Sequence, residues 1–335
     1  MVDLPTISIV IPTRDRPEEL ANLLKSILNQ VSPPIEVVVV DDSISSSGRS
    51  TVHSFNLQFK TNGCSLIFLE GLGRGLTAGR NLGVSVCRGD AVLFLDDDNL
   101  LDPITIVTLA SFLATNPKAF GVQFVILDPT YNHRTVITEK LRNALFKVLG
   151  QNYFDRDNQT VRRSGNSVLP YDVSKVIPAE HLSGCSCYRR EVFHHLSFDL
   201  NLKRWGFRED IDFSYRLQKR IPGSLWVIPT PKIIHKPSTK ARRPTGLRVR
   251  AEIVYAFYVF FKDFFDGSVL NLLAFLWSLI GWLGIVFCDL LFGSKPKNIG
   301  MCLPYLAMAY LISLKNLRSI LMGRLSFFND TLKET

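Results

Sequence analysis

The sequence predicts an α/β fold: a mainly parallel sheet flanked by helices, followed by C-terminal hydrophobic helices. Three observations support this prediction. Short apolar runs alternate with segments of helical periodicity over residues 7–127. The 335 residues suffice for one large domain and an accessory segment. The composition also changes near residue 240, first to basic and then to apolar.

The alternation within residues 7–127 is regular. Residues 7–11 are an apolar run that stops at Pro12, and Pro17 opens a segment whose Leu and Ile residues recur at helical spacing. Strands separated by helices in this way form parallel sheets, and such sheets bind ligands beyond the carboxyl ends of their strands. The predicted strands cover 7–11, 35–40, 66–69, 91–95 and 121–127, and the predicted helices begin at 17 and cover 77–86 and 104–114.

The polar residues 128–180 interrupt this pattern. A segment of that length without clear periodicity inside a domain is typical of a functional loop or lid. After it we expect a small strand-and-helix unit over 184–196, a helix over 209–220, and short strands over 225–228 and 232–235.

The chain is basic, with a formal net charge of +9 and a pI near 9.3. This charge suits nucleic acid, an anionic membrane or a polyanionic substrate. The basic residues of 236–250 precede the apolar C-terminal segment, so the membrane is the simpler partner and we expect no nucleic acid. The six cysteines are scattered, which favours buried free thiols and a reducing compartment.

The C-terminal part divides into two uncharged runs. Residues 269–288 are about long enough for one membrane span, whereas 299–314 are shorter. A basic stretch before an apolar run is expected on the cytoplasmic side. We therefore predict a cytoplasmic domain over 1–240, and over 241–335 a basic linker with membrane-associated helices that either span the bilayer or lie on it. A buried helical subdomain is the alternative.

Three consecutive acids, Asp96, Asp97 and Asp98, follow the predicted strand over 91–95. Their mutual repulsion requires a compensating positive charge, and clustered carboxylates suit Mg²⁺ or Mn²⁺. The alternative is a helix N-terminus, which explains Asp102 but not three acids directly after a strand. Strand alternation predicts that Asp96 and Asp98 face the same side.

Other candidate residues lie further along the chain. The acids of 209–212 either stabilise a helix N-terminus or supply a general base, and we expect one of Asp210 and Asp212 to be structural. His235 either completes a metal site or is a structural histidine. Arg80 follows a glycine-rich turn and suits phosphate, but that turn comes after the third strand, which argues against a Rossmann dehydrogenase.

Taken together, the motifs resemble the family 2 glycosyltransferases with the GT-A fold, over roughly residues 5–240. No single motif is decisive, but their order along the chain is specific. The stretches that carry the resemblance are ISIVIPTRDR (7–16), VVVVDDS (37–43), AGRNLG (78–83), LDDDN (95–99) and residues 206–216.

The resemblance implies an inverting transfer of one sugar from a nucleotide-sugar donor, typically UDP-linked, to an acceptor hydroxyl. By position, the implied roles are as follows: Pro12, Thr13 and Arg14 border the base; Asp42 hydrogen-bonds the base; Asp97 contacts the ribose or sugar; Asp96 and Asp98 hold Mg²⁺ or Mn²⁺ at the diphosphate; Arg80 lies near the diphosphate; His235 is a late metal or diphosphate contact; and Asp210 is the catalytic base.

Some positions depart from the family pattern. Arg14 and Asp15 stand where Tyr-Asn is common, and residues 205–208 (Trp-Gly-Phe-Arg) replace small residues before the Glu-Asp pair. The Gln-x-x-Arg-Trp motif of processive members is missing, so we expect transfer of a single sugar.

The resulting prediction is an enzyme of cell-envelope polysaccharide synthesis that acts on a glycan or a lipid-linked acceptor. One alternative is a nucleotidyltransferase, although no phosphate-activating lysine motif is found. Another is a membrane-tethered sugar-nucleotide-binding protein without catalysis, against which the metal acids and Asp210 argue.

Overall fold

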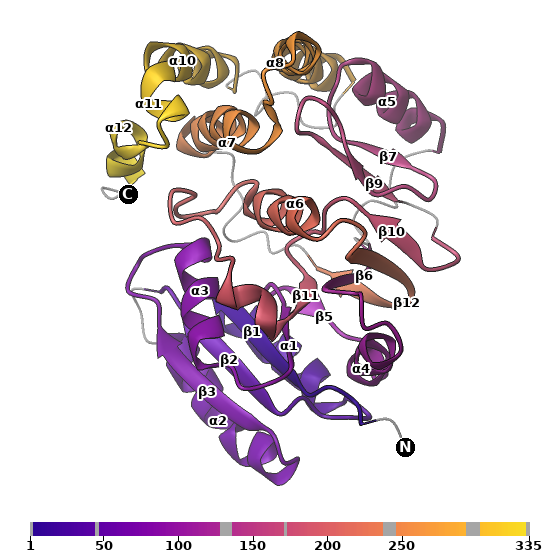
Figure 1. Ribbon diagram of the computed structural model, residues 1–335. Helices are drawn as coiled ribbons and strands as arrows, with labels where there is room; N and C mark the ends of the chain where they lie inside the picture. Colours follow the sequence, from indigo (N-terminus) through magenta and orange to yellow (C-terminus); the bar gives the residue numbers. More distant parts are fainter. Residues whose placement is uncertain are drawn as a thin grey trace. The chain divides into compact units, whose positions relative to one another are not determined.

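The computed structural model describes residues 3–43, 47–127, 136–170, 173–236, 246–292 and 302–332. The chain forms two compact units (Figure 1). Unit 1 comprises Met1–His133 and Asp172–Ser238, and unit 2 comprises Arg134–Tyr171 and Thr239–Thr335. Residues 134–171 thus group with the C-terminal part, whereas the sequence placed them in the domain over 1–240.

A mainly parallel sheet forms the centre of unit 1, as predicted. β1 lies between β2 and β4 and is parallel to both, and β3 extends the sheet beyond β2. β11 lies between β4 and β6 and is antiparallel to both, and β10 and β5 are antiparallel to β12. The spatial order is β10-β12-β6-β11-β4-β1-β2-β3, with β5 beside β12. The strands are β1 Ile7–Thr13, β2 Glu36–Asp41, β3 Ser65–Glu70, β4 Ala91–Phe94, β5 Asn99–Leu100, β6 Gly121–Leu127, β10 Ile177–Ala179, β11 Ser186–Arg189 and β12 Leu225–His235.

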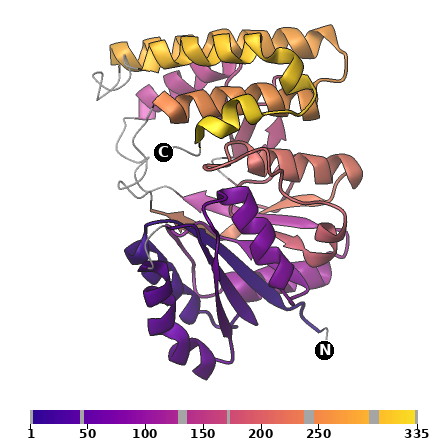
Figure 2. The same cartoon turned by 90° about the vertical axis from the view of Figure 1, so that its left-hand side faces the viewer.

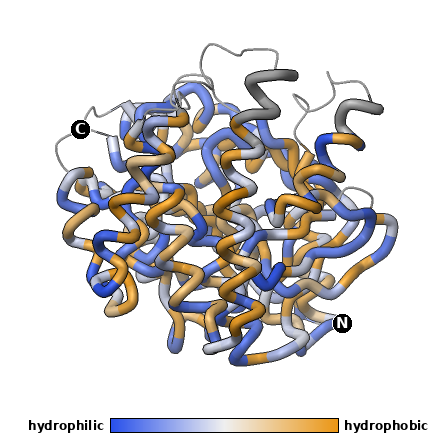
Figure 3. The backbone as a smooth tube through the Cα atoms, turned by 90° about the horizontal axis from the view of Figure 1, so that it is seen from above, coloured by the Kyte–Doolittle hydropathy of each residue, from blue (hydrophilic) through white to orange (hydrophobic). Residues whose placement is uncertain are grey.

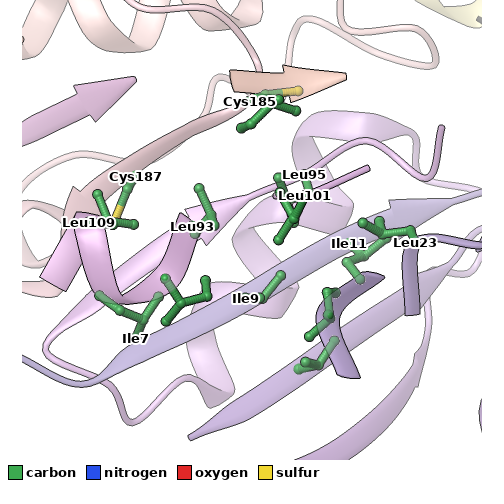
Figure 4. Packing of buried hydrophobic residues seen from close by; sticks show 14 of the residues in the cluster. Ile7, Ile9, Ile11, Leu23, Leu93, Leu95, Leu101, Leu109, Cys185 and Cys187 are labelled. Carbon is green, nitrogen blue, oxygen red and sulfur yellow. The ribbon is translucent and has the colours of Figure 1, made fainter. Parts of the chain in front are cut away.

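Helices cover both faces of this sheet because the strand side chains alternate. Ile9 of β1 packs in the cluster with α1, α2 and α4, and the neighbouring Val10 packs in the cluster with α6. Figure 4 shows Ile7, Ile9 and Ile11 in the first cluster with Leu93, Leu109 and Cys187. The unit 1 helices are α1 Pro17–Leu28, α2 Ser47–Thr61, α3 Leu76–Val86, α4 Thr105–Thr115, α6 Glu209–Arg220 and the 3₁₀ helix η2 Arg190–His194.

The structure corrects three sequence expectations. The prediction omitted α2, whose buried Val52, Phe55 and Phe59 are separated mainly by polar residues. The prediction of a loop over 128–180 was wrong, because this segment contains one helix and several short strands; its residues 128–135, 171 and 172 lie outside the described part. The two strands expected over 225–235 form the single strand β12, whose pairing with β6 is irregular between Ile228 and Ile233.

Unit 2 combines a small sheet with helices. Its strands pair in the order β7-β9-β8. Its elements are α5 Val136–Val148, β7 Tyr153–Asp155, β8 Thr160–Val161, β9 Ser167–Pro170, α7 Gly246–Val259, the π-helix η3 Phe260–Phe264, α8 Val269–Phe292, α10 Cys302–Lys315, α11 Leu317–Leu321, α12 Ser326–Asn329 and the 3₁₀ helix η4 Asp330–Leu332.

Two further sequence predictions concern a membrane span and buried free thiols. A membrane span over 269–288, one of the two arrangements left open by the sequence, is not confirmed, because no helix in the described ranges has both the length and the apolar character needed to cross a bilayer. The prediction of buried free thiols is confirmed for Cys64, Cys87, Cys185 and Cys187.

Close packing between α3 and β1 gives a test of the fold. A Cβ added at Gly83 would overlap the Val10 side chain, whereas one at Gly79 would lie 3.6 Å from Val40 Cγ1, an ordinary contact. We expect Gly83→Ala to destabilise the protein by about 1–2 kcal/mol through overpacking. Gly79→Ala, in the same helix, should be neutral or stabilise it by up to about 1 kcal/mol. Urea unfolding measures both, and equal stability of the two variants would contradict the packing of α3 on β1.

Candidate active site

The three aspartates after β4 have very different environments. The Asp96 side chain is 40% exposed, whereas that of Asp97 is 4% exposed and that of Asp98 is fully buried. The predicted alternation does not hold, because β4 ends at Phe94 and the acids lie in the following turn. Asp96 lies beside the Arg80 side chain, whereas Asp98 lies beside the Arg16 side chain.

Arg16 holds Asp97 and Asp98 together. Its Nη1 donates to Asp97 Oδ1 at 2.8 Å and lies 3.4 Å from Asp98 Oδ2. The Thr13 hydroxyl donates to Asp97 Oδ2 at 2.8 Å. Burial raises the pKa of Asp97 to about 6, and Arg16 and Thr13 oppose that shift. Asp97 is therefore fixed by the protein itself, and its predicted contact with the ribose or sugar stays a prediction.

The role of Arg16 was missed by the sequence analysis. Arg16 directly precedes α1, just beyond the carboxyl end of β1, and β1 pairs with β4 in the register Val10 to Phe94. Residues that follow these two strands must therefore meet. With that register known, the motif Thr-Arg-Asp-Arg would have indicated a positively charged side chain beside the acids.

Asp98 and His235 form the pair that fits a divalent cation. His235 Nε2 lies 3.2 Å from Asp98 Oδ1, and β12 brings it there by pairing with β5. Two neighbouring ligands of an octahedral Mg²⁺ are separated by about 3 Å, and this ion is commonly held by one or two carboxylates together with substrate phosphates. Within the described ranges no three His, Cys, Asp or Glu residues cluster closely enough to bind a metal by themselves. The pair therefore suits a cation that a diphosphate helps to hold.

Arg80 links the acid cluster to helix α6. Its Nη1 donates to both carboxylate oxygens of Glu209 at 2.7 Å, and its Nη2 lies 3.5 Å from Asp96 Oδ1. The guanidinium is buried, with its Cζ 5.4 Å from the centre of the Phe94 ring and 5.3 Å from that of Phe198. Burial raises the pKa of Glu209, and the Arg80 charge opposes this. The diphosphate contact predicted for Arg80 remains a prediction.

Helix α6 separates two roles among its acids. Asp212 is fully buried and accepts from Arg216 Nη2 at 2.6 Å and Nε at 3.2 Å, so it is the structural acid expected from the sequence. Asp210 is half-buried, and its Oδ1 accepts from the Ile211 amide at 2.8 Å. Because Glu209 is fixed by Arg80, the first turn of α6 holds Asp210 in a defined place.

Asp42 fixes the loop before α3. Its Oδ1 and Oδ2 accept from the amides of Arg74 at 3.0 Å and Gly75 at 2.9 Å. The Leu76 amide then donates to Arg204 O at 2.9 Å, and a side chain at Gly75 would collide with the Arg204 backbone. The base contact predicted for Asp42 stays a prediction. Pro12 lies in β1, and Arg14 is 38% exposed with Asp15 at 3.6 Å.

The geometry brings together most of the predicted residues in unit 1. The acids after β4, His235 and the start of α6 are joined by Arg16 and Arg80 through direct contacts. The sequence profile described as "Glycosyl transferase family 2" matches residues 8–196, more than half of the chain. The chain belongs to glycosyl transferase family 2.

The chain is also similar to curated proteins from bacteria. One is a GalNAc(5)-diNAcBac-PP-undecaprenol beta-1,3-glucosyltransferase of Campylobacter jejuni, 33% identical over 98 residues, which cover 29% of this chain and 31% of that protein. Another is a chondroitin synthase of Escherichia coli, 24% identical over 208 residues, which cover 57% of this chain and 29% of that protein. The matches thus span about a third of the length of these relatives.

Solved structures share the fold of the transferase. Residues 1–349 of TarS from S. aureus align with a TM-score of 0.53 at 15% identity, over 98% of this chain and 91% of that one. The mannosyltransferase PcManGT of Pyrobaculum calidifontis, in complex with GDP-Man and Mn²⁺, aligns with a TM-score of 0.55 at 16% identity, over 93% and 88% of the two chains. These likenesses support the GT-A fold.

The buried pair of Arg80 and Glu209 gives a second test. Arg80→Met should destabilise the protein by about 3–5 kcal/mol, because it leaves a buried carboxylate without its cation. Combined with Glu209→Gln, the two losses should be non-additive by about 1–3 kcal/mol.

Urea unfolding of the single and double variants measures this coupling. The control is the exposed pair Arg49 and Glu70, where Arg49→Met should cost less than about 1 kcal/mol. Additive losses at Arg80 and Glu209 would contradict the described contact.

Proposed function

We propose that this transferase moves one sugar, with inversion, from a nucleotide-sugar donor to a hydroxyl of a glycan or a lipid-linked acceptor. The observation that carries the proposal is the bridge formed by Arg80. This single buried side chain contacts Asp96 beside the candidate metal pair and Glu209 beside the candidate base, Asp210. A single displacement requires a donor site and a proton acceptor close together. Arg80 contacts a neighbour of each, which supports this arrangement.

In the proposed step, an acceptor hydroxyl oxygen attacks the anomeric carbon of the donor sugar. The Asp210 carboxylate takes the hydroxyl proton, a new carbon–oxygen bond forms, and the bond to the nucleoside diphosphate breaks on the opposite face. One base is sufficient, so no covalent intermediate on the protein is needed. The contact between Glu209 and Arg80 would keep α6, and with it Asp210, in position.

Asp98 and His235 would hold a Mg²⁺ or Mn²⁺ ion, with Asp96 nearby. When bound, the cation would offset negative charge on the departing diphosphate. Arg16 holds the carboxylates of Asp97 and Asp98 at this edge of the sheet. The presence of Mn²⁺ with GDP-Man in PcManGT, and with UDP in GalNAc-T7, supports a divalent cation here.

We further propose a UDP-linked donor and a role in cell-envelope polysaccharide synthesis, with the catalytic domain on the cytoplasmic side of a membrane. The undecaprenol-linked substrate in the name of the Campylobacter relative supports a lipid-linked acceptor. A thermal-shift screen of nucleotide sugars with Mn²⁺ identifies the donor, because a ligand that binds the native state raises its stability.

Asp98→Ala should abolish Mn²⁺-dependent donor hydrolysis and transfer, because it removes the carboxylate of the metal pair. Sugar transfer with and without added Mn²⁺ measures this. The matched control is Asp102→Ala, which removes an exposed aspartate four residues away and should leave transfer unchanged. Full activity of the Asp98 variant would refute its role as a metal ligand.

Asp210→Asn should retain donor binding in the thermal-shift assay and lower the transfer rate by at least about 100-fold, because the amide cannot accept the proton. Asp212→Asn should instead weaken stability, because it loosens the contact with Arg216. If Asp210→Asn lost donor binding, Asp210 would be a ligand or a structural residue and not the base.

A further inference from the structure

Helix α8 exposes apolar side chains over its described residues 269–284. Between residues 269 and 284, every exposed side chain is large and apolar. At 100° per residue these positions fall within an arc of about 140°, so they form one continuous face. They are Val269, Leu270, Leu273, Leu276, Trp277, Ile280 and Leu283.

The buried side of α8 carries Phe275, which stacks on Phe260, together with small residues. Ser278 and Gly281 are buried, and a side chain at Gly281 would collide with the Leu149 carbonyl. A Cβ at Gly284 would lie 2.8 Å from Leu149 Cδ1. Small residues let backbones approach closely, which is typical of helices whose outer face contacts lipid. A surface helix in water presents polar and charged residues on its outer face, whereas the outer face of α8 over 269–284 is apolar.

Helix α10 lies beside α8 and also exposes apolar side chains. Tyr310 of α10 donates to Leu279 O of α8 at 2.6 Å, and the two helices lie together in unit 2 (Figures 1 and 2). Leu306, Ala309 and Ser313 are buried, whereas Leu311 is 68% exposed. Seen from above, the traces of these helices are mainly hydrophobic (Figure 3). The exposed apolar side chains of α10 are Leu303, Pro304, Tyr305, Ala307, Met308, Leu311 and Leu314.

The net positive charge of the chain lies in unit 2, the unit that contains α8 and α10. Unit 2 contains 19 Lys and Arg against 9 Asp and Glu, for a formal charge of +10, whereas unit 1 contains 20 against 21, for −1. Lys315, Arg318 and Arg324 are exposed at or beyond the end of α10, and Arg250 Nη1 lies 3.7 Å from Met308 Sδ. An apolar face with cations beside it matches an anionic lipid surface.

We propose that the exposed apolar face of α8 and α10 lies in the headgroup region of an anionic membrane, with its side chains inserted and the neighbouring cations on lipid phosphates. This deepens the proposed membrane association by naming the surface and the mode of attachment, which is interfacial. A second copy of the chain fits less well, because pairing two such faces would bring like charges together.

Sedimentation with vesicles tests this surface on the full chain. Wild-type protein should bind vesicles of phosphatidylcholine mixed with an equal amount of phosphatidylglycerol, and bind phosphatidylcholine vesicles more weakly. Leu273→Glu combined with Leu311→Glu should weaken binding to the mixed vesicles by at least about tenfold per substitution. Replacing Lys315, Arg318 and Arg324 by Gln should weaken it by about fivefold per charge, and only on the anionic vesicles.

The matched control adds the same two charges elsewhere. Val31 and Leu57 in unit 1 are 71% and 76% exposed, so Val31→Glu with Leu57→Glu should bind vesicles as the wild type does. Donor binding by thermal shift, read on every variant, should be unchanged, which separates failure of the membrane surface from failure of the transferase function.

Three outcomes would overturn the proposal. Wild-type protein that binds neither vesicle type would exclude a lipid surface, and equal loss in the control variant would make the effect one of net charge. A detergent-free wild-type dimer that the Leu273→Glu, Leu311→Glu variant converts to monomer, without vesicle binding, would assign the face to a second copy. Light scattering after size exclusion distinguishes this case.

Discussion

The buried guanidinium of Arg80 sets the arrangement of the candidate site. Glu209 and Asp96 come from segments more than a hundred residues apart, and each would be repelled by the other acids nearby. One planar cation, packed between Phe94 and Phe198, contacts both. A guanidinium suits this place because it stays charged when buried and can bind a carboxylate through two donors. The position of α6 against the sheet therefore depends on an electrostatic contact as well as on apolar packing.

Arg16 and Arg80 divide the acids of the site between them. Arg16 binds Asp97 and Asp98 at the end of β4, and Arg80 binds Asp96 and Glu209. The acids that remain accessible are Asp96 and the half-buried Asp210. The positive charges of these two arginine side chains thus let the protein concentrate negative charge where a metal ion and a proton acceptor are proposed.

The sequence predicted those parts of the structure that depend on local periodicity. The strands β1, β2, β4 and β6 are mainly apolar runs. The acids that follow β4 end such a run abruptly, which is a clear local signal. Contacts that depend on strand register, such as that of Arg16 with Asp97, have no local signal. Helix α8 shows the same limit, because its composition is mainly apolar and only the packed structure reveals which face is outside.

The loop at Gly75 packs against the loop at Arg204, although the two loops are far apart in sequence. Asp42 binds the amides of Arg74 and Gly75, and the next amide binds the carbonyl of Arg204, a few residues before Asp210. A displacement at the end of β2 would break these hydrogen bonds unless the turn that precedes α6 moved with it. We therefore expect the end of β2 and the turn before α6 to move together.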